Sequence, residues 1–279
     1  MRKNIFEILE SRYDINNEFV VIEQLFNSPL LIDNRYCVNG NQTTIVNAVN
    51  NTCFYKWKQR GACLTAEDMM KKLDLTGLKA LADEGKICKL EYICNMVNLV
   101  NTKLFSPYFT KTCEFLMFEQ NINILLEHLN YEKYVFKEDE KVILIPKNPA
   151  ATAVAEISSE DTAMAILMYH HASLKGKLAE KKDILRRIAQ EYEPTLDKPI
   201  EGFTDYFKTA NNMLNNLDIR HNNRDGKNKK ELVLNLTDLE LENWYDELYQ
   251  LLLFCVLIKD NKNRKDKMAE FLKGLKEHK

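Results

Sequence analysis

A cation, an imidazole and several amides follow one another within residues 211–230, NNMLNNLDIRHNNRDGKNKK. Arg220 and His221 come directly after a run of apolar residues with helical spacing. A guanidinium can hold a phosphate through two parallel hydrogen bonds, and an imidazole can move protons near neutral pH. These side chains are therefore suited to chemistry on a phosphate group.

The residues beyond His221 are polar, with a local excess of positive charge. Asn222 and Asn223 supply amide donors, and the basic Arg224 and Lys227 surround a single acid, Asp225. RNA cleavage without a metal requires a base for the 2′-hydroxyl, an acid for the leaving oxygen and a cation for the phosphorane. The segment contains residue types for each of these tasks.

A structural interpretation of the same residues stays open. In it, Arg220 pairs with an acid such as Glu191 or Glu193 at a capped helix end, and a solvated loop follows. His171, on the apolar side of a predicted helix, is a secondary candidate for the site. Its alternative role is packing at the edge of the core. Neighbouring His170 would point about 100° away on a helix, so at most one of the two should face a given site.

Other chemistries have little support in the sequence. The seven cysteines are odd in number and none forms a CxxC pair, so we expect buried reduced thiols and no metal site. P-loop, Rossmann glycine, HExxH and GxSxG patterns are all absent from the sequence. We therefore expect no cofactor.

The bulk composition favours helix over sheet. The 279 residues contain 8 Gly and 6 Pro and are 45% hydrophobic, enough for one large core or two smaller ones. The net charge is −2, so attraction to nucleic acid must come from a local patch. The longest apolar run, residues 251–258, is far shorter than the roughly 20 residues that span a bilayer. We expect a cytoplasmic protein with no membrane association.

The apolar pattern predicts two parts. Residues 1–150 read as an N-terminal helical region in which Thr43 or Thr44 caps a helix, with a small β-hairpin near residues 134–146. Pro149 marks the boundary to residues 151–279, which read as a four-helix bundle. The predicted class is mainly α.

The four helices of the bundle should position the Arg220 segment. They are expected at 161–172, from 178 to just before Pro194, at 203–219, and from 236 onward. Thr237 or Asp238 should cap the last helix, and Trp244 is among its expected core positions. Arg220 and His221 would then lie at the end of the third helix.

Residues 161–263 resemble HEPN domains, especially those of bacterial abortive-infection proteins. The matching features are two helices ending at Tyr192-Glu-Pro, a third running into Leu217-Asp-Ile-Arg-His-Asn-Asn, and a last helix rich in Trp, Tyr and Leu. Members that cut RNA carry an Arg, a polar residue and a His further along the chain. Arg220 matches the Arg and His221 the polar position, but Asp225, Gly226 and Lys227 stand where that His would fall.

The resemblance implies a metal-independent endoribonuclease of phage defence that acts as a homodimer, with two motifs facing one groove. Arg220 and His221 would be catalytic, and Asp225 could contribute. The expected substrate-binding residues are Asn222, Asn223, Arg224 and Lys227. The missing downstream His favours an alternative, a catalytically inactive HEPN-like module that binds RNA or a partner protein. An ordinary helical scaffold is the third hypothesis. Domain order alone suggests a sensor or regulatory role for residues 1–150.

Overall fold

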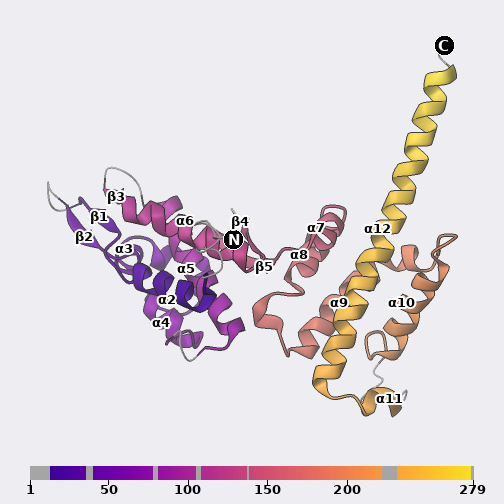
Figure 1. Ribbon diagram of the computed structural model, residues 1–279, viewed down its shortest axis with the longest axis horizontal. Coiled ribbons are helices and arrows are strands. Elements are labelled where there is room, and N and C mark those ends of the chain that lie inside the picture. Colours follow the sequence, from indigo (N-terminus) through magenta and orange to yellow (C-terminus); the bar gives the residue numbers. More distant parts are fainter. Residues whose placement is uncertain are drawn as a thin grey trace, which may run out of the picture. The chain divides into compact units, whose positions relative to one another are not determined.

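The computed structural model describes residues 13–35, 40–77, 81–104, 108–136, 138–221 and 231–277. The chain divides into two compact units, Met1–Lys147 and Asn148–Lys279. Both are built mainly from helices (Figure 1), which confirms the predicted fold class. The division lies close to Pro149, where the sequence pattern changes.

The first unit contains five helices of different lengths among its described residues. They are α2 (Ile15–Phe26), α3 (Ile45–Asn50), α4 (Ala66–Lys72), α5 (Asp83–Lys103) and α6 (Cys113–His128), with 3-10 turns η1 (Phe54–Lys56) and η2 (Lys58–Arg60). Thr44 caps α3 by accepting a hydrogen bond from the Asn47 amide, as one of the two predicted alternatives had it.

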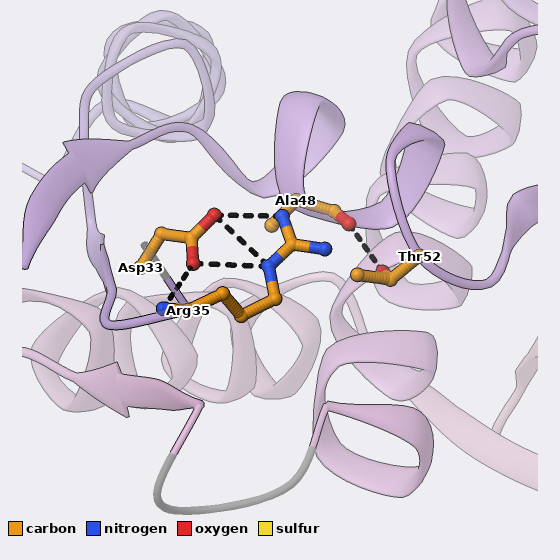
Figure 2. Close-up of polar contacts among 4 residues, drawn as sticks. All are labelled: Asp33, Arg35, Ala48 and Thr52. Carbon is orange, nitrogen blue, oxygen red and sulfur yellow. Dashed lines mark hydrogen bonds and ion pairs between the residues drawn. The ribbon is translucent and has the colours of Figure 1, made fainter. Parts of the chain in front are cut away.

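The first unit also holds a three-stranded sheet that the sequence pattern did not predict. Its antiparallel strands are β1 (Leu31–Asp33), β2 (Asn41–Thr43) and β3 (Phe109–Lys111), in the order β2-β1-β3. The Arg35 guanidinium donates hydrogen bonds to the Asp33 carboxylate at the end of β1 (Figure 2). Arg35 also lies 4.7 Å from the centre of the Phe109 ring. Arg35 therefore contacts residues of both β1 and β3.

The predicted hairpin is present as β4 (Tyr131–Phe136) and β5 (Lys141–Pro146). An isolated hairpin is only marginally stable. Here α5 side chains pair with β5: the Asn95 amide exchanges two hydrogen bonds with the Val142 backbone, at 2.7 and 2.9 Å. The Glu91 carboxylate accepts a third from the Leu144 amide at 2.7 Å. The helix therefore satisfies backbone groups that would otherwise be an open edge.

The second unit is helical throughout its described residues. Its elements are α7 (Pro149–Ala155), α8 (Glu160–Met168), the 3-10 turn η4 (Ala172–Leu174), α9 (Leu178–Leu196), α10 (Thr204–Asn216), α11 (Glu231–Leu234) and α12 (Asp238–Glu277). Their buried apolar side chains form one core that includes Tyr169, Leu185, Phe207, Tyr245 and Leu252.

Several sequence predictions for this unit were wrong. The helix expected at 161–172 ends at Met168, so His171 lies in the turn before η4 and not on a helix. The helix expected at 203–219 ends at Asn216.

Helix α9 does not end before Pro194 but continues to Leu196, because a proline in the last turn removes only one helical hydrogen bond. Trp244 is not a core residue: its side chain is 48% exposed, while neighbouring Tyr245 points inward. No helix among the described residues is long and apolar enough to cross a membrane.

Candidate active site at the end of α10

The chain leaves α10 through a sharp reversal that sets the position of Arg220. Asp218 adopts a left-handed backbone conformation with φ of 65°, which aspartate tolerates better than most residues. The Arg220 amide then donates to the Leu214 carbonyl at 3.0 Å, inside the last turn of the helix. The reversal therefore folds Arg220 back onto α10.

Helix α9 holds this reversal from the side. The Lys182 ammonium lies 2.6 Å from the Asp218 carboxylate. The Arg186 guanidinium donates to the Ile219 carbonyl through two nitrogens, at 3.2 and 3.1 Å. Two cations from one helix thus fix the backbone on which Arg220 is carried.

The Arg220 guanidinium is held by amides and by one acid. Its Nη1 donates to the Asn211 Oδ1 at 3.2 Å and to the Asn215 Oδ1 at 3.5 Å. Its Nη2 lies 3.7 Å from the Glu193 carboxylate, an ion pair too long to be a hydrogen bond. Nη2 is buried and has no hydrogen-bond partner in the described part of the chain. The site therefore holds a fixed cation with unused donor capacity.

The acid near Arg220 is one of the two suggested by the sequence. Glu191 is engaged elsewhere, because its carboxylate accepts from the Ser159 amide at 2.8 Å at the start of α8. Burial opposes ionisation of Glu191, yet the hydrogen bonds from Ser159 and Thr162 lower the pKa of its carboxyl. Glu193 is left to face Arg220.

His221 is exposed, in contrast to the half-buried Arg220. No interaction among the described residues joins its ring to the Arg220 guanidinium. The two predicted catalytic residues are therefore neighbours in the chain but lie in different environments. The predicted substrate-binding residues Asn222, Asn223, Arg224 and Lys227, and the secondary candidate Asp225, lie outside the described residues.

His171 is positioned for a structural task. It is 6% exposed, and its Nδ1 accepts a hydrogen bond from the Ser173 amide at 3.2 Å, which caps η4. The Ser173 hydroxyl lies 2.8 Å from the same nitrogen. These contacts are with its own turn, so none of them brings His171 to Arg220.

An apolar groove of about 590 Å³ lies beside the end of α10. Met213, Leu217 and Leu236 contribute apolar walls, and the exposed Trp244 indole lines it from α12. Thr209, Asn212 and Asn216 complete its lining, which is almost entirely apolar. Leu217 lies three residues before Arg220, so the groove and the held cation share one end of the helix.

The same unit contains a buried polar cluster that was not predicted from the sequence. The Lys181 ammonium lies 2.8 Å from the Glu242 carboxylate and 2.7 Å from that of Asp246. It also lies 5.1 Å from the centre of the Tyr169 ring, which stacks on Tyr249 at 4.0 Å. Since Lys181 is 4% exposed and doubly paired, the cluster joins α9 to α12 and offers no free cation.

The titratable groups of this cluster are shifted by burial and by one another. Burial would raise the pKa of Glu242, but the hydrogen bonds from Lys181 and the Gly176 amide outweigh it and lower that pKa. Burial lowers the pKa of His170 against the opposing effect of Asp246. The spacing of Glu242 and Asp246 by one helical turn was the only sign of this cluster in the sequence. It could not identify their partner Lys181, which lies more than 60 residues away in the chain.

The described residues contain no group of three or more His, Cys, Asp or Glu side chains arranged to hold a metal ion. Comparison with known proteins gave no match: no family model, no curated protein and no solved structure is significantly similar to this chain.

Proposed function

We propose that the second unit is a metal-independent endoribonuclease of the HEPN type that acts in phage defence, in the bacterial cytoplasm. The observation that carries the proposal is the state of Arg220. A buried guanidinium nitrogen without a hydrogen bond has lost its hydration without full compensation. A phosphate oxygen would supply the missing acceptor and would gain a charge-assisted hydrogen bond.

The chemistry assigned to the site is transfer of the phosphoryl group within the RNA chain. The 2′-oxygen forms a bond to phosphorus while the bond to the 5′-oxygen breaks, and a cyclic phosphate results. A base takes the 2′-hydroxyl proton and an acid protonates the leaving oxygen. Arg220 stabilises the charge on the phosphorane. Since each chain offers one His221, a homodimer would supply one imidazole for each proton.

The groove at Trp244 suits the RNA of this proposal. An exposed indole is a platform on which any base can stack, and such stacking is sequence-tolerant. A base held there would place the neighbouring backbone near the end of α10.

A second candidate is a catalytically inactive HEPN-like module that binds RNA or a partner protein. Two observations favour it: residues 224–227 contain no His, and Arg220 is engaged by Asn211, Asn215 and Glu193. In this form the cation would bind phosphate without a proton-transfer partner. Binding without cleavage separates this candidate from the first.

The test is cleavage of total RNA and tRNA in EDTA by the wild type, Arg220→Ala and His221→Ala. Arg264→Ala is a matched control, because Arg264 is an exposed cation on α12 paired with Asp260. We expect each site variant to lose at least roughly a hundredfold in rate, as general acid–base catalysts and charge-stabilising donors commonly contribute. The control should cleave like the wild type.

Binding measurements decide between the two candidates. Trp244→Ala should weaken RNA binding by roughly 5- to 150-fold, the usual effect of removing one stacking platform. Cleavage that survives both site substitutions would exclude this site from the mechanism. RNA binding that depends on Arg220 and Trp244, without cleavage by any form, would favour the inactive module.

A further inference from the structure

Helix α12 continues well beyond the core of the second unit (Figure 1). Its last buried side chain is Val256, and every side chain described from Asn261 onward is exposed. At a rise of about 1.5 Å per residue, residues 261–277 form an extension of roughly 25 Å. We call these residues the α12 extension.

The α12 extension carries a stripe of large apolar side chains in water. Met268, Phe271, Leu272 and Leu275 are 64%, 67%, 57% and 52% exposed. At about 100° per residue they fall within a sector of about 100° on the helix surface. No described residue covers this stripe, and exposed contiguous apolar surface of this kind marks an interaction site.

The charges of the α12 extension are sorted around the stripe. Lys265 and Lys267 flank it on its two sides, about 20° and about 40° beyond its edges. Asp266 and Glu270 lie on the opposite face of the helix, within about 30° of the point farthest from the stripe. Lys262 and Lys273 lie toward that far side, and Arg264 lies within the sector of the stripe, one turn before Met268, where it pairs with Asp260. Basic groups therefore border the apolar surface, and the acids point away from it.

We propose that the α12 extension lies on an anionic membrane surface. In this position the apolar stripe enters the boundary between headgroups and acyl chains. The stems of Lys265 and Lys267 follow the apolar surface while their ammonium groups reach lipid phosphates on either side. Asp266 and Glu270 stay in water, away from the negative headgroups. The association is peripheral and is independent of the RNA activity proposed above.

A second copy of the same helix fits the stripe less well. Pairing two stripes in parallel would bring Lys265 and Lys267 of one helix beside Lys267 and Lys265 of the other. Like charges at these flanking positions disfavour helix pairing. An anionic surface meets both flanks with opposite charge, so the charge pattern favours lipid.

The test is co-sedimentation of the full chain with vesicles. The wild type should bind vesicles of phosphatidylglycerol and phosphatidylcholine, and binding should weaken as salt is raised because the lysine contacts are screened. Vesicles of phosphatidylcholine alone should bind at least about tenfold less. Phe271→Ser/Leu272→Ser, and separately Lys265→Glu/Lys267→Glu, should each reduce binding by at least about tenfold.

Asp266→Asn/Glu270→Gln is the matched control, because it changes two charges on the opposite face of the same helix. It should bind anionic vesicles at least as well as the wild type. Circular dichroism and sedimentation velocity of each variant report the fold and the oligomeric state. Absence of vesicle binding by the wild type would overturn the proposal. So would full vesicle binding by both the Phe271→Ser/Leu272→Ser variant and the Lys265→Glu/Lys267→Glu variant. A dimer that only the stripe substitutions dissociate, without vesicle binding, would assign the stripe to a second copy instead.

Discussion

Lys181 and Arg220 are both cations fixed in the second unit, yet their surroundings lead to different roles. Lys181 is buried between the carboxylates of Glu242 and Asp246, which together neutralise it. Arg220 has one distant acid and two amides, and one of its nitrogens lacks a hydrogen bond among the described residues. A buried cation that two carboxylates neutralise holds helices together. A cation that lacks a hydrogen-bond acceptor can instead bind an anionic ligand.

The Lys181 cluster predicts a stability that depends on pH. Glu242→Gln removes one of the two carboxylate charges that Lys181 faces and should lower the free energy of unfolding at pH 7 by about 2 kcal/mol. The pKa of Glu242 is lowered from its ordinary 4.5, so its contribution is complete above that pH and is lost as pH falls through the lower folded-state value. The difference between variant and wild type should therefore shrink below pH 4.5.

Urea denaturation at pH 7 and at successively lower pH values measures this difference. Trp244 fluorescence reports the second unit when Trp57 is replaced by Phe, because the chain has only these two tryptophans. Glu247→Gln is the control, since Glu247 is exposed on the same helix. A loss of stability that is equal at every pH would contradict the assigned role of the carboxylate.

At the level of single residues, the sequence could indicate which residue types are suited to the site but not which side chains contact one another. It predicted that an acid at 191 or 193 could face Arg220, and Glu193 does so. It could not show that Asn211 and Asn215 hold the guanidinium, because several asparagines at the same helix were equal candidates. The sequence contained no sign that Lys181 is buried, since a lysine is buried only when distant residues neutralise it.

Helix α12 begins at a capping box in which Thr237 and Glu240 exchange two hydrogen bonds. The Thr237 Oγ1 accepts from the Glu240 amide at 3.2 Å, and the Glu240 carboxylate accepts from the Thr237 amide at 2.8 Å. Thr237→Ala should cost about 1 kcal/mol in the free energy of unfolding of the second unit. Thr237→Ser keeps the hydroxyl and should stay near the wild type in the same urea titration. An equal loss in both variants would show that the methyl group, not the cap, matters.

The helices and strands that could be predicted were those whose residues form an apolar or capping pattern within a short stretch of the chain. The hairpin follows from the apolar run at 142–145, and Thr237 from its position before a long helical stripe. The three-stranded sheet could not be predicted, because each strand has three residues and β1 pairs with β3, almost 80 residues away. Trp244 was placed in the core because apolar spacing does not distinguish a buried aromatic from one that lines an open groove.

For the whole molecule, the division into two units predicts that each folds alone. The core of the second unit is formed entirely by residues between Ala151 and Val256. The first unit has its own core around Phe54, Phe115 and Phe118, and buries Trp57, whose indole donates to the Glu140 carbonyl at 3.0 Å. Fragments 1–147 and 148–279 should therefore each unfold in one cooperative transition. A fragment without a cooperative transition would contradict this division.

The same fragments test whether residues 1–147 restrain the second unit, as domain order suggests. Each unit carries one tryptophan, so unfolding of either can be followed in the full chain and compared with its fragment. If the first unit is regulatory, fragment 148–279 should bind or cleave RNA several-fold more strongly than the full chain. Adding fragment 1–147 in trans should then reverse part of that gain. Equal activity in fragment and full chain would assign the first unit a role other than restraint, because a restraining domain must lower the activity of the domain to which it is joined.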